Sequence, residues 1–448
     1  MLKKVLVANR GEIALRVIRA CRELDIPTVA VYSTADRFSL PVLLSNESIC
    51  IGAPKPFESY LDSRRILSAA IISNSDAIHP GYGFLAENAD FAEKCFAHGI
   101  KFIGPTANMI RQMGDKVKAK EIMDEVGIPT IPGSKGLVES YDRALAVAEE
   151  ISYPIMIKAA YGGGGKGMRI VRKQDELKGS FSIAKLEAEN AFGNSGVYLE
   201  RYVENPRHIE VQLLGDGKGK VIYLGERDCS IQRRHQKLIE ESPSPAVDEI
   251  TRKMIGETAA RGASVIKYEG AGTIEFLLDV SGDFYFLEMN TRIQVEHPVT
   301  ESVVDMDLVK EQIRIANGLG LSRSQDDISL SGHAIECRIN AEDPSKGFAP
   351  RPGKITAFHP PGGPGVRVDT HAYAEYVITP YYDSMIAKLI CRGRDRAEAL
   401  ARMNRALDEF IIEGIPTTIP FHKKVINDPN FIAGDYNTAF IERFSNNL

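Results

Sequence analysis

The chain has 448 residues, of which 44% are hydrophobic and 26% charged, values typical of a globular protein with room for about three domains of roughly 150 residues. A net charge of -5 and a pI of about 6.1 argue against a nucleic-acid partner, which would favour a basic domain. No apolar run approaches the roughly 18 residues that span a membrane, so a membrane protein is not expected either.

Two further features bear on location. Residues 1–8 enter a strand pattern at once and match neither a signal peptide nor a transit peptide, so we expect a cytoplasmic protein. The six cysteines form no CxxC pair and show no zinc-ligand spacing, which indicates buried thiols in a reducing compartment. Cys229 lies in a charged run and could border a site, but no partner base marks it as a nucleophile.

The first hundred residues alternate strand and helix. Apolar and β-branched runs predict strands at 5–8, 28–32, 77–78 and 101–103, with helices at 13–24, 61–70 and 89–97. This order predicts an α/β fold that begins with a doubly wound parallel sheet. Ligands bind beyond the carboxyl ends of such strands, where the loops 9–12 and 79–88 combine glycines with polar side chains. Ordinary turn chemistry is the alternative for both loops.

Two more units are expected after this sheet. A helix predicted at 115–126, which Gly127 stops, leads through a linker into the second unit. The polar segment 322–331 is the expected boundary of the third unit. That unit begins with a strand at 334–340 and ends in a helix with an apolar stripe and a capping-box-like start at Asp395.

The glycine loop, residues 162–167, lies between two predicted strands. It fails the Walker A pattern, because Gly167 rather than Ser or Thr follows Lys166 and the loop opens no helix. We interpret it as a flexible flap whose backbone N–H groups and lysine close on phosphate oxygens. Lys158 ends the preceding apolar strand and is expected to face an anion, since lysine is rarely buried unpaired. A surface hairpin with a snorkelling lysine is the alternative.

Residues 273–290 have the pattern of a β-hairpin, and a two-residue turn at 281–282 would place Glu275 opposite Glu288. Two like charges about 4 Å apart repel by about 4 kcal/mol at an effective dielectric constant near 20. Either a cation lies between the carboxylates or one of them holds a proton. Mg²⁺ suits carboxylates together with substrate phosphates, and Asn290 would add an amide oxygen. A shared proton, or side chains on opposite faces, is the alternative.

A row of polar residues continues from this hairpin. Alternate residues carry charges or amides: Glu288, Asn290, Arg292 and Gln294. In an extended segment these side chains share one face, and Glu296 extends the row if the extension continues. The preceding residues 284–287 are strongly apolar. A polar row that emerges from a buried strand is what a site for a metal and an anion needs.

Together these pieces resemble the ATP-grasp enzymes, and specifically the biotin carboxylase family, over essentially the whole chain. The resemblance is carried by residues 8–14, 79–85, the glycine loop, 226–237 and 288–298, of which the last two are the most specific. It implies a Rossmann-like N-terminal domain at 1–114 and an ATP-grasp α+β domain at 115–320. A mobile lid within the latter, at about 131–203, and a C-terminal α+β domain at 331–448 complete the implied organisation.

The family resemblance implies an ATP-dependent carbon–nitrogen ligase that carboxylates biotin on a biotin carboxyl carrier protein through carboxyphosphate. This is the first half-reaction of acetyl-CoA carboxylase in fatty acid synthesis. ATP, two Mg²⁺ or Mn²⁺ ions, carrier-bound biotin, carboxyltransferase subunits and a second copy in a homodimer are the implied ligands and partners. The chain contains no Met-Lys-Met motif to bear biotin, so a stand-alone subunit is expected.

Three alternatives stay open beside this function. The chain could serve a pyruvate or propionyl-CoA carboxylase, since these systems share the same type of subunit. It could be another ATP-grasp ligase that acts on an amine or carboxylate acceptor. It could also be a nucleotide-binding regulatory subunit that binds ATP without turnover.

The resemblance also implies roles for single residues. The expected ATP contacts are Lys116, Lys158, Gly163, Gly164, Gly165, Lys166, His208, Gln232, His235, Leu277, Glu275 and Glu288, with Glu200, Arg201, Tyr202 and Val203 as the adenine hinge. The expected metal ligands are Glu275, Glu288 and Asn290. The expected bicarbonate cradle is Arg292, Gln294 and Val295. Glu296 is expected to act as the base, Arg338 to face the ureido oxygen of biotin, and Lys237 to face phosphate.

Two departures from the family pattern affect details. The hairpin turn at 280–283 is one residue longer than usual, which would shift the register near Glu275. Pro364 takes a place where the family carries an aromatic residue near its dimer interface. The packing of the expected dimer therefore differs there, whereas the chemistry does not.

Overall fold

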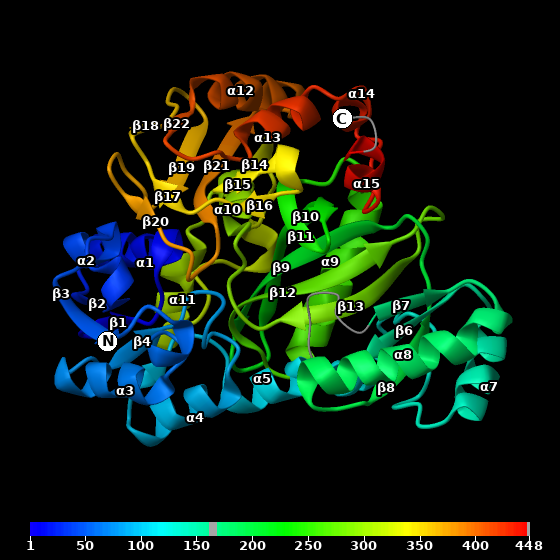
Figure 1. Ribbon diagram of the computed structural model, residues 1–448. Coiled ribbons are helices and arrows are strands. Elements are labelled where there is room, and N and C mark those ends of the chain that lie inside the picture. The colour runs from blue at the N-terminus through cyan, green and yellow to red at the C-terminus, as the bar shows by residue number, and fades with distance from the viewer. Residues whose placement is uncertain (161–167, 446–448) are drawn as a thin grey trace.

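A five-stranded, an eight-stranded and a three-stranded sheet organise the chain in the computed structural model, which describes residues 1–160 and 168–445 (Figure 1). The five-stranded sheet is N-terminal, the eight-stranded sheet runs from the centre into the C-terminal part, and the three-stranded sheet forms a unit beside it. The glycine loop lies outside the described residues, so the flap with Gly163, Gly164, Gly165 and Lys166 stays a prediction. None of the described helices has the length and apolar character needed to cross a membrane.

The N-terminal sheet is parallel throughout, with the strand order β3-β2-β1-β4-β5. Its strands are β1 (Val5–Val7), β2 (Thr28–Ser33), β3 (Glu47–Gly52), β4 (Ala77–His79) and β5 (Lys101–Phe102). The accompanying helices are α1 (Gly11–Glu23), α2 (Leu40–Leu44), α3 (Ser63–Ile72), α4 (Ala89–Ala97) and α5 (Ala107–Gly114). Val5 and Val7 pack in one cluster with α1, whereas Leu6 packs in another with α3 and α4. Helices therefore cover both faces, and the predicted doubly wound parallel sheet is confirmed.

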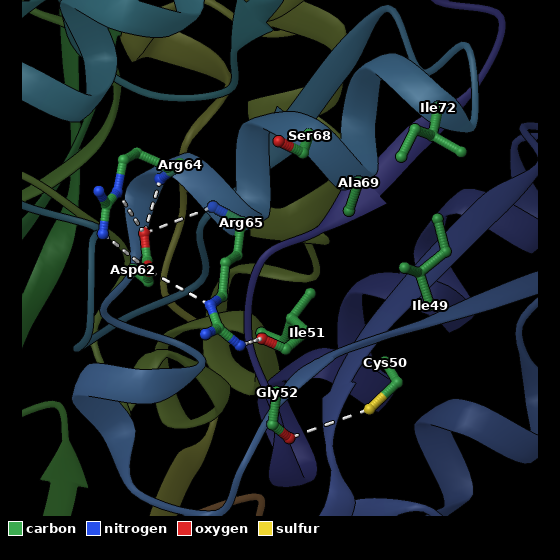
Figure 2. A pocket seen from close by; sticks show the side chains of 10 residues that line it. All are labelled: Ile49, Cys50, Ile51, Gly52, Asp62, Arg64, Arg65, Ser68, Ala69 and Ile72. Atoms are coloured by element: carbon green, nitrogen blue, oxygen red, sulfur yellow. Dashed lines mark hydrogen bonds and ion pairs between the residues drawn. The ribbon is translucent and has the colours of Figure 1, made fainter.

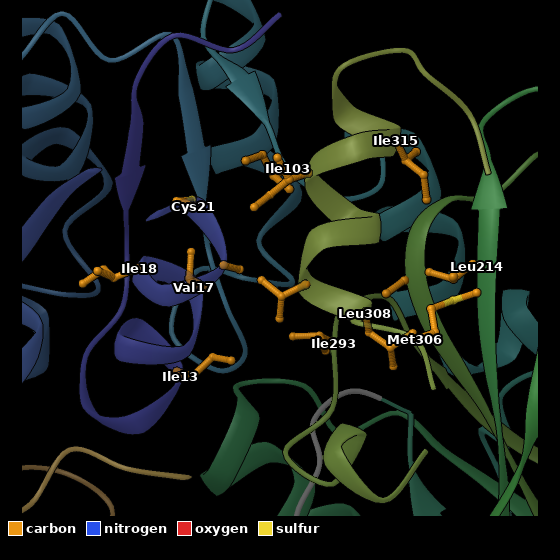
Figure 3. Close-up of a cluster of buried hydrophobic side chains, with 14 of the residues drawn as sticks. Ile13, Val17, Ile18, Cys21, Ile103, Leu214, Ile293, Met306, Leu308 and Ile315 are labelled. Carbon is orange, nitrogen blue, oxygen red and sulfur yellow. The ribbon is translucent and has the colours of Figure 1, made fainter. Parts of the chain in front are cut away.

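Helix α1 attaches this sheet to the rest of the molecule. Its apolar residues recur at helical spacing, as Ile13 and Val17 show, and so form a stripe along one side. Figure 3 shows this stripe beside α11 (Leu308–Ala316), and residues of both helices share a buried cluster with Leu214 of the eight-stranded sheet. Apolar packing thus fixes the N-terminal sheet against the centre.

The eight-stranded sheet is antiparallel throughout. In spatial order its strands are β13 (Phe284–Asn290), β12 (Glu269–Leu278), β9 (Arg207–Asp216), β10 (Val221–Arg233), β11 (Gln236–Ser242), β14 (His333–Asn340), β21 (Met385–Gly393) and β19 (Val366–Thr370). The pairing of β11 with β14 joins the central part to the C-terminal part. One hydrogen-bonded sheet therefore carries residues that lie far apart in the sequence.

Helices and short strands surround this sheet. The central helices are α6 (Lys116–Glu125), α9 (Glu249–Val265), α10 (His297–Val304) and α11, and the C-terminal ones are α12 (Arg396–Glu409), α13 (Ile419–Ile426), α14 (Pro429–Ala433) and α15 (Phe440–Ser445). The short strands are β15 (Glu342–Asp343), β16 (Ala349–Pro350), β17 (Gly353–Lys354), β18 (Ala357–His359), β20 (Val377–Ile378) and β22 (Ile411–Glu413). Helix α10 packs against β10, β11, β14 and β21, and this contact positions the turn that precedes it.

Helix α6 begins at a well-defined cap. The Asp115 side chain accepts hydrogen bonds from the backbone N–H groups of Val117 and Lys118 at 3.0 and 3.1 Å. Such a cap satisfies N–H groups that have no partner within the helix. The helix therefore starts one residue later than predicted and places Lys116 in its first turn.

The three-stranded sheet has the order β7-β6-β8 and is antiparallel. Its strands are β6 (Ile155–Ala159), β7 (Met168–Val171) and β8 (Val197–Arg201), and its helices are α7 (Tyr141–Ile151) and α8 (Gln174–Phe192). Ala144, Val147 and Leu177 of these helices pack with Ile155 and Ile157 in a buried cluster of their own. This unit therefore has its own small core beside the larger sheet.

The hairpin between β12 and β13 corrects the predicted turn. The prediction of a two-residue turn at 281–282 is wrong, because the loop is longer and extends from Asp279 to Asp283. The Asp279 N–H donates to the Asp283 carbonyl at 2.9 Å and closes this loop. The longer loop shifts the register by one residue next to it. A β-bulge then restores the register, so Glu275 pairs with Glu288 as predicted.

Candidate active site

Lys237, on β11, is the centre of the polar site. Its ammonium nitrogen lies 2.5 Å from Glu210 Oε2, 2.9 Å from Glu275 Oε1 and 2.7 Å from Glu296 Oε1. These carboxylates come from β9, β12 and the turn before α10, so three elements converge on one cation. Burial opposes the charge of Lys237, but Glu210, Glu275 and Glu296 outweigh it and raise the pKa well above its ordinary value. Lys237 is therefore charged at neutral pH.

Glu275 is held as a carboxylate by two cations and two amides. His208 Nε2 lies 3.0 Å from its Oε2, and Asn290 and Gln294 donate to its Oε1 at 3.0 and 3.1 Å. Burial alone would raise the pKa of Glu275, but Lys237 and His208 more than compensate, and the pKa is lowered. The sequence left open that either Glu275 or Glu288 is protonated. The low pKa shows that Glu275 is not the protonated one.

Glu288 lies opposite Glu275 but takes a different partner. Its Oε2 lies 3.4 Å from Lys116 Nζ, and its side chain is 37% exposed, against 6% for that of Glu275. Lysines on both sides thus offset the repulsion expected between the two carboxylates. The donor set, two carboxylates with one open side, fits Mg²⁺, which takes one or two carboxylates and substrate phosphates. The Asn290 amide oxygen, the third predicted ligand, accepts a hydrogen bond from Arg292 Nη2 at 3.0 Å.

The polar row of residues 288–296 converges, although its predicted geometry is wrong. Strand β13 ends at Asn290, and the chain then turns, so the later residues do not share a strand face. Arg292 instead gathers the row through its own hydrogen bonds, donating from Nη1 to Gln294 Oε1 at 2.8 Å and from Nη2 to Asn290. Its Nε donates to Glu87 Oε2 at 2.8 Å, which anchors the guanidinium to the predicted loop 79–88.

Glu296 lies between two cations. Its Oε1 contacts Lys237 at 2.7 Å and its Oε2 contacts Arg338 Nη2 at 3.0 Å. Burial and the charge of Glu210 raise the pKa of Glu296, but Lys237 and Arg338 lower it by a larger amount, so the net shift of the pKa is downward. Glu296 is thus a carboxylate at neutral pH, the state in which it can accept a proton.

Two neighbours complete this part of the site. Lys388, fully buried on β21, donates from Nζ to the Val295 carbonyl at 2.9 Å and fixes the peptide before Glu296. Cys229 Sγ lies 3.9 Å from Glu296 Oε1, so this cysteine borders the site as its charged surroundings indicated. Burial raises the pKa of the Cys229 thiol well above its ordinary value, which makes it a poor nucleophile.

A second charged group lies between the three-stranded sheet and α6. The Glu200 carboxylate is 2.6 Å from both Lys120 Nζ and Lys158 Nζ. Burial raises the pKa of Glu200, but Lys158 and Lys120 outweigh it and bring the pKa to about 2. Lys158 therefore faces an anion, as predicted, and in this structure the anion is Glu200.

The remaining predicted nucleotide residues lie around these two groups. Gln232 pairs directly with Lys237, and Arg234 and His235 form the turn between β10 and β11 with φ of +49° and +65°. Positive φ at both turn residues is the pattern of a type I′ hairpin. Burial lowers the pKa of His235, and the charges of Lys158 and then of His208 lower it further.

The adenine hinge residues Arg201, Tyr202 and Val203 follow Glu200 at the end of β8. Arg201 donates to the Tyr285 hydroxyl at 2.7 Å, and the Tyr202 N–H donates to the carbonyl of residue 154 at 2.9 Å. Val203 is buried. Leu277, on β12, pairs with His208 on β9.

One connected network thus contains all four predicted catalytic residues, Lys237, Arg292, Glu296 and Arg338, together with the predicted binding residues His208, Glu275, Asn290 and Gln294. Single motifs did not reveal the residues that hold it together: Glu87, Glu210, Arg227, Glu240 and Lys388. Glu210 had a signal, because it alternates with His208 and Gln212 within one strand, and all three are buried. Glu87 and Arg227 lie in the segments 79–88 and 226–237, which the sequence had marked, but nothing there indicated their partners. Glu240 and Lys388 had no signal, because their partners come from distant segments.

A groove elsewhere on the surface contains none of these residues. It has a volume of about 650 Å³ and is lined by residues of β3 and α3. Figure 2 shows Cys50, Arg64 and Arg65 among its lining residues. Asp62 holds Arg64 and Arg65 at its rim. The groove follows the edge of the N-terminal sheet and is separate from the network around Lys237.

Three family models match successive parts of the chain. The biotin carboxylase N-terminal domain matches residues 1–110, and the ATP-binding domain of the carbamoyl-phosphate synthase L chain matches residues 115–324. The biotin carboxylase C-terminal domain matches residues 336–443. Together these models span nearly the entire sequence.

Relatives match over the full length. A biotin carboxylase from Nostoc sp. is 59% identical over 442 residues, which cover 99% of each chain. A pyruvate carboxylase subunit from Methanothermobacter thermautotrophicus is 54% identical over 444 residues, 99% of this chain and 90% of that protein. A crystal structure of the biotin carboxylase domain dimer of Hydrogenobacter thermophilus 2-oxoglutarate carboxylase, with MgADP, ADP and bicarbonate, superposes with a TM-score of 0.96. It is 50% identical and covers 99% of this chain and 98% of that one.

Proposed function

The chain belongs to the biotin carboxylase family, and from this premise we propose that it uses ATP to transfer the carboxyl group of bicarbonate to biotin on a carrier protein. The observation that carries the proposal is Glu296, a carboxylate 2.7 Å from Lys237 and 3.0 Å from Arg338. Lys237 in turn contacts Glu275, a proposed metal ligand beside the phosphates. A base thus lies between a phosphate-facing cation and a biotin-facing cation.

The first step joins bicarbonate to phosphate. Arg292 holds the bicarbonate anion as a fork beside Gln294 and Val295, and Glu296 removes the proton of its hydroxyl. The freed oxygen attacks the γ-phosphorus of ATP, the bond from that phosphorus to the bridging oxygen breaks, and ADP and carboxyphosphate form. Lys237 stabilises the charge on the transferred phosphoryl group, so positioning and electrostatics supply most of the catalysis.

Lys237 also tunes the base. In the structure its ammonium contributes to the low pKa of Glu296. When the phosphates of bound ATP draw this ammonium toward themselves, Glu296 loses part of that stabilisation and becomes more basic. Nucleotide binding therefore prepares the proton transfer that follows.

The second step carboxylates biotin. Carboxyphosphate breaks down to CO₂ and phosphate, and the phosphate takes the proton from N1 of biotin. N1 then attacks the carbon of CO₂, while Arg338 stabilises the negative charge on the ureido oxygen. A closed site excludes the water that would hydrolyse carboxyphosphate, and the glycine flap is proposed to provide this closure.

Glu275, Glu288 and Asn290 are the residues we assign to two Mg²⁺ or Mn²⁺ ions. When bound, the metal offsets the charge of the ATP phosphates. Among the residues proposed to contact ATP are Lys116, Lys158, Gly163, Gly164, Gly165, Lys166, His208, Gln232, His235 and Leu277, with the hinge from Glu200 to Val203. Two salt bridges support this assignment. Lys116 lies beside Glu288, a proposed metal ligand, and Lys158 lies beside Glu200, at the start of the proposed hinge.

The organisation we propose follows the same family. It has an N-terminal domain at 1–114, an ATP-grasp domain at 115–320 with a lid at about 131–203, and a C-terminal domain at 331–448. A biotin carboxyl carrier protein and carboxyltransferase subunits are the proposed partners, a homodimer the proposed assembly, and the cytoplasm the proposed location. The relative crystallised as a biotin carboxylase domain dimer supports the homodimer.

An ADP-release assay tests the function. The purified chain is supplied with ATP, Mg²⁺, bicarbonate and free biotin, and each component is omitted in turn. We expect ADP release that needs both bicarbonate and biotin, together with transfer of labelled carbon from bicarbonate to biotin. Activity on amine or carboxylate acceptors but not on biotin would identify another ATP-grasp ligase. Binding of ATP without phosphate transfer would identify a regulatory subunit.

The final acceptor has two candidates. We propose acetyl-CoA carboxylase as the system that this chain serves, because chains named simply biotin carboxylase are among its most similar relatives. The 54% identity to a pyruvate carboxylase subunit favours pyruvate as the second candidate. Purification of the native protein with its bound carrier and carboxyltransferase would decide between them, since the carboxyltransferase determines the acceptor.

A further inference from the structure

Two acidic side chains behind Arg338 have no role in the proposed mechanism. Strands β11 and β14 pair so that Glu240 stands directly opposite Glu336, and both residues are 0% exposed. Directly opposed residues of an antiparallel pair point to the same side of the sheet. Arg338, two residues further on β14, lies on that side too and is opposed by Lys388 on β21. Two acids and two bases thus form adjacent pairs on one buried face.

The oxygens of this acid pair are mostly without donors. Glu240 Oε1 accepts from Arg338 Nε at 2.6 Å. The other oxygen of Glu240 and both oxygens of Glu336 are buried and have no hydrogen-bond donor in the described residues. Two facing carboxylates repel each other in a buried site, and one of them is normally relieved by a proton. The pair is therefore expected to hold a proton at neutral pH.

The charges around Glu240 agree with this expectation. Burial raises its pKa, Arg338 lowers it, Glu296 raises it and Lys237 lowers it, and the pKa is about 7. Burial also raises the pKa of Glu336 well above its ordinary value, in spite of Lys388 and Arg338. Besides burial, the charge of Glu240 also raises the pKa of two buried thiols, those of Cys229 on β10 and Cys337 on β14. Near neutral pH, Glu336 is neutral and Glu240 changes its charge.

Glu240 holds one edge of the Arg338 guanidinium. Arg338 Nε and Nη2 both lie within 2.6 Å of Glu240 Oε1, and Nη2 also contacts Glu296 at 3.0 Å. Nη1 makes no hydrogen bond within the described residues. The backbone carbonyl of Arg338 accepts from Thr418 Oγ1 at 2.9 Å, so the main chain is fixed as well. The contacts of Nε and Nη2 with Glu240 and Glu296 leave Nη1 as the nitrogen that can donate to a substrate oxygen.

We propose that Glu240 and Glu336 form a buried acid pair that holds one proton and positions Arg338 for biotin, so that protonation of Glu240 loosens this arginine. The inference rests on the proposed function, because biotin is the substrate that Arg338 meets. Glu240 and Glu336 are positioning residues, since they act through Arg338. Their effect is expected in the Michaelis constant for biotin and in its pH profile, and not in the Michaelis constant for ATP.

The direction of the pH effect follows from Glu240. Above a pH of about 7 its carboxylate is charged and holds Arg338, and below this pH it binds a proton and the ion pair weakens. For the wild type, kcat/KM for biotin should therefore fall as the pH is lowered from 8 to 6 at a constant concentration of bicarbonate ion. Glu240→Gln imitates the protonated side chain at every pH.

The kinetic test compares Glu240→Gln with a matched control. Glu241→Gln changes the next residue of β11, which is also buried and paired with an arginine, Arg396, at 2.7 Å, but which points to the other face. We expect Glu240→Gln to lower kcat/KM for biotin about tenfold at pH 8, to abolish the fall between pH 8 and 6, and to leave the KM for ATP unchanged. Glu241→Gln should keep the wild-type profile. An unchanged profile in Glu240→Gln would overturn the inference.

Infrared spectroscopy tests the proton without any turnover. A neutral buried carboxylic acid has a carbonyl-stretch band that a carboxylate lacks. At pH 8, where Glu240 is mostly charged, the difference spectrum of the wild type minus Glu336→Gln should contain this band. Because Glu336→Gln replaces one neutral group by another, this variant should stay folded. A difference spectrum without this band would overturn the acid pair. A wild-type protein that shows the band but does not carboxylate biotin would instead contradict the proposed function.

Discussion

The two largest sheets differ in what they bury. In the N-terminal sheet, β1 is apolar and fully buried, and helices cover both of its faces. In the eight-stranded sheet, Glu210, Arg227 and Glu240 are buried just as completely. A buried charge is costly unless partners compensate it. The comparison teaches that the interior of the first sheet serves folding, whereas that of the second is arranged around charges that the chemistry uses.

The largest expected effect, which tests the contrast between the two sheets, is a loss of activity in a variant that stays folded. We expect Glu296→Gln to lower kcat by about 10²- to 10⁴-fold, the usual contribution of a general base. The protein should stay folded, because glutamine keeps the shape and its single amide oxygen still accepts from one of the two cations, while Glu210 and Glu240 remain as carboxylate partners of Lys237 and Arg338. Paired measurements of kcat and Tm check this. A kcat within tenfold of wild type would show that Glu296 is not the base.

The next effect concerns a charge pair that is fully buried. Arg227 donates to Gln212 at 2.8 Å and to Thr300 at 2.9 Å, and it pairs with Glu210. Arg227→Met should destabilise the fold by about 3–5 kcal/mol, because it breaks a buried ion pair and leaves Lys237 as the remaining cation beside the Glu210 carboxylate. Denaturant unfolding measures this loss.

A double variant separates charge from packing at the same place. Arg227→Met combined with Glu210→Gln should recover part of the stability, because the carboxylate that lost its arginine partner is then replaced by a neutral amide. If the double variant is as unstable as Arg227→Met, the loss comes from packing, and the contrast between the two sheets is weaker than we describe.

The matching change in the apolar sheet is Leu6→Ala. Leu6 is fully buried among residues of α3 and α4. Truncation of such a leucine costs about 2–5 kcal/mol of folding free energy. Because β1 contributes no side chain to the network around Lys237, kcat per folded molecule should stay at the wild-type value. A Leu6→Ala protein with a changed KM for bicarbonate would break the separation of roles.

Acid should weaken the charged sheet through its carboxylates. Burial raises the pKa of Glu241, but His333 and Arg396 outweigh it and bring the pKa to about 2 from 4.5. A depressed pKa stabilises the fold above the unfolded value and loses this contribution as the pH falls from about 4.5 to 2. The shift corresponds to about 3 kcal/mol.

Urea unfolding at pH 6 and pH 3 measures this contribution. The wild type should lose more stability between the two pH values than Glu241→Gln does. Equal losses in the two proteins would show that Glu241 is not preferentially stabilised as a carboxylate in the folded state.

The smallest expected effect is at a helix cap. Asp115→Ala should cost about 1 kcal/mol, the typical value for loss of an N-cap. Asp248→Ala removes the equivalent cap of α9, whose side chain accepts from the Thr251 N–H at 2.8 Å. Both variants should lose similar stability, but only Asp115→Ala should also weaken ATP binding, because α6 positions Lys116. Equal ATP affinities in the two variants would contradict the role given to Lys116.

The sequence predicted the N-terminal sheet well and the eight-stranded sheet poorly, for a physical reason. Where strands are apolar and helices amphipathic, periodicity indicates both, and α4 begins and ends where predicted. The edge strand β3 was missed because its side chains are mostly exposed. Strand β10 was missed because the consecutive charged residues Glu226, Arg227 and Asp228 break the alternation on which strand prediction depends. Strand β9 was missed although its polar and apolar residues alternate.

The candidate site followed a similar rule. Residues close in sequence, such as Asn290, Arg292 and Gln294, were grouped correctly from their spacing, although the chain leaves the strand after Asn290. Glu87 was not grouped with Arg292, because their contact joins segments 205 residues apart. Glu240 was missed for the same reason, since its link to Arg338 depends on the pairing of β11 with β14.

That pairing has a mechanical consequence. Because β14 is hydrogen-bonded to β11 along the sheet, the segment between the central and C-terminal parts is a boundary in the chain but not a hinge in space. Arg338 and Lys237 therefore stand on one stiff frame, and their spacing cannot change much during a catalytic cycle. The three-stranded unit shares no sheet with this frame in the described residues, so bending that admits nucleotide is expected at the two segments that connect it to the rest of the chain.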